Sequence, residues 1–223
     1  MLLARRRATG LTPSKLSSVH RRLVIDASVL INLLGTRSPA IVLRTLRRIF
    51  VIDEITLREV TLDPATRRSA QDVLTQLQAE RLLEVIHMGS EAYDQFIEFT
   101  GAQPPDDLDD GEAAVLAQAA FGNCVAVIDE RKATRIARQQ LPNLIILNSI
   151  DLLAAPQLLH ELGRDRVSDA IYLALRDARM RVPRNVRPWI ATLLGYDRVQ
   201  DCPTLGPFHP ENLLRQSMNE NNV

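Results

Sequence analysis

The sequence predicts an α/β fold in which helices cover a central parallel sheet. Short apolar runs rich in valine and isoleucine alternate with longer stretches of helical period, which is typical of strand-helix-strand units. Several of those stretches open with a recognisable helix start. At 223 residues and 46% hydrophobic composition, the chain can bury one good core but is too short to argue for two full domains.

Five apolar runs are predicted to form the strands. They are residues 23–25, 49–52, 83–86, 124–128 and 144–147. The acidic stretch PPDDLDDGE separates the third run from the fourth. We interpret it as a loop within one domain, because the two strands after it could not close a core alone.

Two helix starts combine a capping residue with a proline at the first helical position, Ser38-Pro39 and Asp63-Pro64. In the helices expected after Pro64 and after Gly111, apolar side chains share one face that would cover the sheet. They are Ala70, Val73, Leu74 and Leu77 in the first helix and Val115, Leu116, Ala119 and Ala120 in the second.

Both ends of the chain are expected to lie outside the folded domain. We predict a disordered basic arm at 1–22, the domain at 23–195 and a polar tail at 196–223. The arm resembles an import presequence in composition, but it lacks a secretory apolar region and a cleavage site.

Charge and composition narrow the classes of function. The 27 basic and 27 acidic residues cancel, so any contact with nucleic acid must be local. The two cysteines lie far apart, and Cys124 opens the apolar run CVAVI, which indicates a buried reduced thiol. No apolar run has the length of a membrane span, so we expect a soluble, cytoplasmic protein without a membrane partner.

Two aspartates directly follow predicted strands. Asp26 ends LVID and Asp129 ends VAVID, and a helical pattern follows each. In an open α/β sheet, ligands bind beyond the carboxyl ends of the strands, so both side chains are expected to point into that crevice. The alternative for either residue alone is that it only caps the next helix.

Further acids fit the same cluster. Glu112 opens a helix whose apolar face is committed to the core, and Glu59 follows the second strand, where a helix is expected to begin. The alternative for Glu112 is a capping box with Asp109, which leaves Asp110 and Gly111 unexplained. We therefore keep Asp110 as a candidate metal ligand beside Asp26, Glu112 and Asp129.

Converging carboxylates repel one another and raise each other's pKa, so such a site is favourable only with divalent cations bound. Oxygen ligands without cysteine or histidine select Mg²⁺ or Mn²⁺. The histidines are scattered without metal-ligand spacing, which argues against zinc. A metal site of this kind polarises a phosphodiester and activates a water, so hydrolysis needs no protein nucleophile.

Four motifs together resemble a known family. The segments DASVLINLL, REV, DDGEAAVLAQAA and VAVIDERKATRIA occur in the order found in PIN-domain nucleases. They are most similar to the VapC-like toxin ribonucleases whose third acid is the glutamate of a GE motif. The resemblance covers about 23–195, including the closing segment LALRDARMRVPRNVRPWIATLLG.

The resemblance implies a three-layer α/β/α sandwich and roles for individual residues. Asp26, Glu59, Glu112 and Asp129 correspond to the four catalytic acids in order, and Ser28 to the small hydroxyl or amide residue that accompanies the first. It further implies cleavage of single-stranded RNA with Mg²⁺ or Mn²⁺. Many members are toxins held inactive by an antitoxin protein. Separately, we keep a homodimer as a candidate assembly, because the sequence does not determine the oligomeric state.

Two positions, Thr134 and Asp169, differ from the family pattern. Thr134 stands where this branch often has an arginine, which weakens the case for a substrate contact there. Asp169, in SDAIYLALRDA, resembles the third acid of other PIN proteins, but it follows the last strand and is in the wrong order. We interpret Asp169 as a helix-start residue.

Arg131, Arg135 and Arg138 recur at helical spacing directly after Asp129, so one helix face near the metals is a candidate phosphate-binding surface. The alternative is a solvated charged face.

The predicted function is therefore a metal-dependent endoribonuclease. The alternative is a PIN-like module that binds RNA or a protein without cutting, against which the retention of all four acids argues. Phosphatases of the haloacid dehalogenase type need a second aspartate where this chain has Ser28. Receiver domains order their acids differently.

Overall fold

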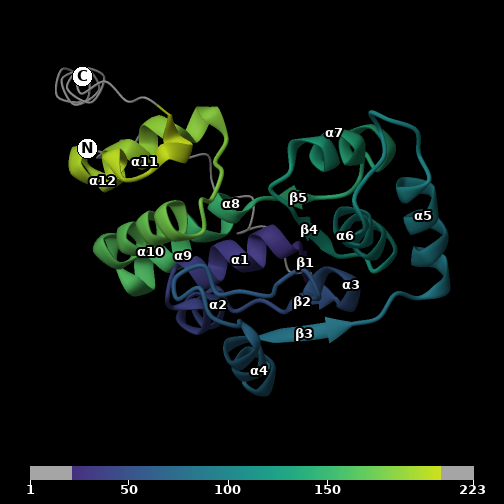
Figure 1. Ribbon diagram of the computed structural model, residues 1–223, viewed down its shortest axis with the longest axis horizontal. Coiled ribbons are helices and arrows are strands. Elements are labelled where there is room, and N and C mark those ends of the chain that lie inside the picture. The colour runs from purple at the N-terminus through teal and green to yellow at the C-terminus, as the bar shows by residue number, and fades with distance from the viewer. Residues whose placement is uncertain (1–21, 207–223) are drawn as a thin grey trace, which may run out of the picture.

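Five parallel strands form one sheet in the order β3-β2-β1-β4-β5 (Figure 1). The strands are β1 (Leu23–Ile25), β2 (Phe50–Asp53), β3 (Leu83–Ile86), β4 (Val125–Val127) and β5 (Ile146–Leu147). The computed structural model describes residues 22–206. All five strands lie where the sequence predicts them, with β1 and β3 at the predicted bounds and the others within two residues.

The direction in which the chain adds strands reverses between β1 and β4. From β1 the chain adds β2 and β3 on one side, and it then returns to place β4 and β5 on the other. β1 and β4 are direct neighbours, with Ile25 opposite Val127. The residues that follow these two strands therefore meet at the topological switch point, where ligands bind in open α/β sheets.

Helices cover both faces of the sheet, as the predicted three-layer α/β/α sandwich requires (Figure 1). Side chains alternate between the faces of a strand, so Leu23 and Ile25 enter one core while Val24 enters the other. The face of Leu23 packs against α1 (Ala27–Gly35), α2 (Pro39–Leu46), α4 (Gln71–Ala79), α8 (Ser149–Leu153), α9 (Pro156–Leu162), α10 (Arg164–Asp177), α11 (Arg187–Leu194) and α12 (Tyr196–Gln200). The face of Val24 packs against α5 (Ser90–Thr100), α6 (Asp110–Phe121) and α7 (Arg131–Gln140).

One predicted helix start is confirmed and the other is wrong. α2 begins at Pro39 after Ser38, as predicted. Residues 64–66 form a turn instead of a helix, because Arg67 takes the left-handed conformation at φ 59° and the Asp63 N–H donates to Arg68 O at 2.8 Å, which turns the chain back. An aspartate before proline suits such a turn as well as it suits a helix start, and here the helix α4 begins only at 71.

The folded domain extends beyond the predicted boundary at residue 195. α12 and a short 3-10 helix, Pro203–Leu205, follow it, and Val199, Cys202 and Leu205 are buried in the core. Residues 196–206 thus belong to the domain and not to a tail. The rest of the predicted tail and nearly all of the predicted arm lie outside the described residues. Within 22–206, no helix is long and apolar enough to cross a membrane.

The burial of Leu205 gives a test of this boundary. Because Leu205 is 4% exposed in the main core, Leu205→Ala should lower the free energy of unfolding by about 2–5 kcal/mol in urea titrations. Leu62 is 52% exposed, and Leu62→Ala should change it by no more than about 0.5 kcal/mol. Equal effects of the two substitutions would show that 196–206 does not pack on the core.

Candidate active site

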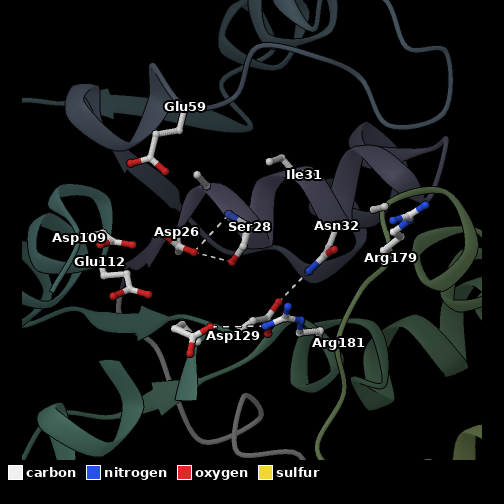
Figure 2. Close-up of a pocket in the computed structure, with 13 residues that line it drawn as sticks. Asp26, Ser28, Ile31, Asn32, Glu59, Asp109, Glu112, Asp129, Arg179 and Arg181 are labelled. Carbon is white, nitrogen blue, oxygen red and sulfur yellow. Dashed lines mark hydrogen bonds and ion pairs between the residues drawn. The ribbon is translucent and has the colours of Figure 1, made fainter. Parts of the chain in front are cut away.

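A pocket of about 400 Å³ lies at the switch point, beyond the carboxyl ends of β1 and β4 (Figure 2). The four acids predicted to be catalytic all line it, each from a different part of the chain. Two further acids and several other residues line it too. The acids are Asp26, Glu59, Asp109, Glu112, Asp129 and Glu130.

Asp26 is both a helix cap and a pocket residue. It is the N-cap of α1, and its Oδ2 accepts hydrogen bonds from the Ser28 N–H at 3.2 Å and from the Ser28 hydroxyl. Asp26 is only 6% exposed. Burial raises the pKa of Asp26, while the bonds from Ser28 oppose that rise. Ser28, which we expected at the substrate, lines the pocket and holds this carboxylate.

Asp129 is fixed by side chains from two other elements. Its Oδ2 accepts hydrogen bonds from Asn32 Nδ2 at 2.7 Å and from Ser149 Oγ at 2.6 Å, and its Oδ1 accepts from the Ser149 N–H at 2.8 Å. Asn32 also donates to Ser149 Oγ at 3.1 Å. Burial raises the pKa of Asp129, the bonds from Ser149 and Asn32 lower it, and the charge of Asp26 raises it further.

Asn32 and Ser149 were missed by the sequence reasoning, although each left a signal. Asn32 is the one amide in the apolar helix ASVLINLLG. Ser149 comes two residues after β5, so the rule that selected Asp26 and Asp129 could have been applied to a third strand end.

Glu112 lies in the first turn of α6. Its Oε2 is buried and has no hydrogen-bond partner among the described residues. Burial, followed by the charges of Asp109, Asp26 and Glu130, raises the pKa of Glu112 to about 7. Asp109 is the N-cap of α6, but its side chain makes no capping hydrogen bond. The capping-box alternative is therefore wrong, and Glu112 is left oriented toward the pocket (Figure 2).

Glu59 packs directly over Gly111. It lies two residues beyond the short helix α3 (Glu54–Leu57), not on the helix as expected. A Cβ atom at Gly111 would approach Glu59 Oε1 to 2.3 Å, so glycine at this position makes room for the carboxylate. Desolvation, followed by the charges of Asp26, Asp109 and Asp110, raises the pKa of Glu59.

Two acids take different places from those predicted. Asp110 is exposed and does not line the pocket, which Asp109 and Glu130 line instead. Asp169 lies within α10 and not at its start, and it forms an ion pair with Arg198 at 2.6 Å. Its position away from the pocket agrees with its exclusion from the acidic cluster.

Comparison with known proteins identifies the family of the chain. A family model described as a PIN domain matches residues 22–187, a stretch that includes all four pocket acids predicted from the sequence. The chain belongs to the PIN-domain family. No curated protein matches it at a significant level. PIN domains are generally nucleases, so the chain has a nuclease-type fold.

The donors of this PIN domain suit a hard divalent cation. The carboxylates supply only oxygen ligands, and Glu112 offers a buried oxygen without a partner among the described residues. Within 22–206, no three histidine, cysteine, aspartate or glutamate side chains are grouped closely enough to hold an ion as they stand. Mg²⁺ usually keeps several waters and takes one or two carboxylates, so Asp26 and Asp129 with water ligands fit it.

A groove beside α7 adjoins the acidic pocket, and we call it the α7 groove. Arg131, Arg135 and Arg138 line it, as does Thr134, whose hydroxyl donates to its own helix at Glu130 O at 2.8 Å. Arg135 pairs with Asp106 at 2.8 Å. The three arginines therefore face a surface groove, and their binding of phosphate stays a prediction.

The raised pKa of Glu112 predicts how metal-free stability depends on pH. Between the usual value of 4.5 and about 7, the folded protein holds a proton that the unfolded chain has lost, so stability falls as pH rises through this window. In EDTA, urea titrations should show that the free energy of unfolding of wild type falls between about pH 5 and pH 8. In Glu112→Gln this fall should be smaller by roughly 1–3 kcal/mol.

Glu91, an exposed glutamate in the first turn of α5, supplies the matched control, and Glu91→Gln should keep the pH dependence of wild type. The same fall in wild type and in Glu112→Gln would contradict a protonated Glu112 in the metal-free pocket.

Proposed function

We propose that this PIN domain is a metal-dependent endoribonuclease that hydrolyses phosphodiester bonds of single-stranded RNA with Mg²⁺ or Mn²⁺. The observation that carries the proposal is the convergence of Asp26, Glu112 and Asp129 on one pocket, although their burial there costs stability. A protein gains from such an arrangement when a cation binds to it. Glu59 is the fourth acid of the proposed site.

Neighbouring residues fix the directions of two of the acids. Asn32 and Ser149 fix Asp129 by three hydrogen bonds, and Ser28 holds Asp26 by two. Such outer partners orient metal ligands and strengthen them. When bound, a divalent cation polarises the phosphodiester, activates a water and stabilises the leaving oxygen.

The α7 groove supports RNA as the substrate. Arg131 and Arg138 form no ion pair within the part of the chain that the structure describes, so their charges are available to phosphates. Arg135 is partly neutralised by Asp106. The antitoxin partner stays a prediction from the resemblance, and the homodimer stays a prediction too. A small protein encoded beside this chain that blocks its cleavage of RNA would support a toxin role.

A PIN-like module that binds RNA or a protein without cutting is the second candidate. It is favoured by the lack of a ready-made three-ligand group among residues 22–206. Burial argues against it. Desolvation destabilises the charged forms of Asp26 and Asp129, and in a module without a cation nothing would offset that cost.

Substitution of single acids tests the proposal. Asp26→Asn and Asp129→Asn change almost no volume but remove a proposed ligand. Each should reduce Mn²⁺-dependent cleavage of labelled single-stranded RNA by about 100-fold or more, since even outer partners of metal ligands contribute 10- to 100-fold. EDTA should abolish wild-type cleavage.

Asp169→Asn is the control, because Asp169 lies outside the pocket, and it should cleave as wild type does. Thermal melts must show all three variants folded. Cleavage within a few-fold of wild type in both pocket variants would refute the assignment.

A further inference from the structure

The acidic pocket adjoins a second hollow. A pocket lined by Arg67, Thr61 and Leu62 shares Ile31, Glu59, Ala178 and Arg179 with it. We call this pocket the Arg67 groove. The α7 groove shares Asp129, Glu130 and Arg181 with the acidic pocket, and it shares no lining residue with the Arg67 groove. The three hollows therefore adjoin one another in a row, with the acids in the middle.

Positive charge predominates in the α7 groove beyond the face of α7. Arg187 is half-buried there, forms no ion pair among the described residues and donates from one terminal nitrogen to Leu205 O at 3.2 Å. The buried Nε of Arg187 and the buried hydroxyl of Thr204 both have no hydrogen-bond partner within residues 22–206. A partly desolvated guanidinium without a carboxylate favours an anion nearby.

Positive charge is also available in the Arg67 groove. Arg67 and Arg179 are exposed and form no ion pair within 22–206. Asp177, which lines the same groove, is paired with Arg176 at 2.7 Å and with Arg37 at 2.8 Å. The bonds from Arg176 and Arg37 lower the pKa of Asp177, so its charge is already compensated.

We propose that a single RNA strand runs through all three hollows, so that arginines hold phosphates on both sides of the bond that is cut. Arg67 and Arg179 hold one side, and Arg187 with the arginines of the α7 groove holds the other. The acids alone would repel a polyanion, and arginines at both ends offset that repulsion. This path rests on the proposed function, because it takes the acidic pocket as the place of cleavage, and it explains why an internal bond would be cut.

Binding of RNAs of two lengths tests the path. Grooves for single strands take about 4–16 nucleotides, so an oligouridylate of about twenty nucleotides exceeds this range and one of about four lies at its lower end. On the proposed path, the long RNA reaches all three hollows and the short RNA does not. Fluorescence anisotropy in EDTA, at several salt concentrations and in the cleavage-deficient Asp129→Asn background, gives the salt slope of the affinity. The short RNA should bind preferentially in the α7 groove, which is lined by more arginines than the Arg67 groove.

For the long RNA, the double variant Arg67→Gln/Arg179→Gln should lower the slope by about 1.4, from about 0.7 for each lost phosphate contact. For the short RNA the double variant should leave the salt slope unchanged. Arg187→Gln should lower the slope by about 0.7 for both RNAs, and Arg187→Lys should restore it. Arg81→Gln is the control, because Arg81 is exposed with φ 56°, close to the φ of 59° at Arg67, and precedes β3 at the opposite end of the sheet.

An unchanged slope for the long RNA in the double variant, or an equal loss for both RNAs, would overturn the path. The two proposals fail separately. If wild type cleaves RNA with Mn²⁺ but the salt slope for the long RNA is unchanged in the double variant, only the path is rejected. If the slopes change as predicted but wild type does not cleave RNA, only the proposed nuclease activity is rejected.

Discussion

Two desolvated aspartates, Asp26 buried and Asp129 half-buried, follow neighbouring strands and set the constraint on which the rest of the site depends. The reversal of strand order between β1 and β4 brings Asp26 and Asp129 to the same crevice. Burial raises the pKa of both, and the charge of Asp26 adds to the rise at Asp129. The fold therefore contains a group of carboxylates that is unfavourable in its ionised, metal-free form.

The surrounding residues are explained by that constraint. Hydrogen bonds from Ser28, Asn32 and Ser149 stabilise the ionised forms of Asp26 and Asp129 and fix the directions of their side chains. Glycine at 111 leaves the space that the Glu59 carboxylate occupies. The net charge of the chain is zero, but arginines gather in the α7 groove and the Arg67 groove. Positive charge is therefore local to the two grooves beside the acids.

The sequence predicts the features that depend on local pattern. The strands and the two aspartates follow from apolar runs that end in an acid, and Glu112 follows from the start of an amphipathic helix. Asn32, Ser149 and Arg187 act through contacts between segments distant in the chain, which periodicity does not reveal. The sequence assigns Asp109 to a possible cap and leaves Asp110 as the candidate ligand, whereas Asp109 is the one that lines the pocket. Neighbouring residues at a helix start point about 100° apart, and a pattern does not fix a helix start to one residue.

Thermal melts of wild type and Asp26→Asn, with and without Mn²⁺, test the central claim that a cation relieves repulsion among these carboxylates. At about a hundredfold excess over its dissociation constant, Mn²⁺ should stabilise wild type by about 2.7 kcal/mol and raise its melting temperature by about 5–10 °C. Asp26→Asn should melt above wild type without metal, since one repelling charge is gone, and should gain less from Mn²⁺. An equal gain in both proteins would mean that the cation binds elsewhere and would contradict the carboxylate site.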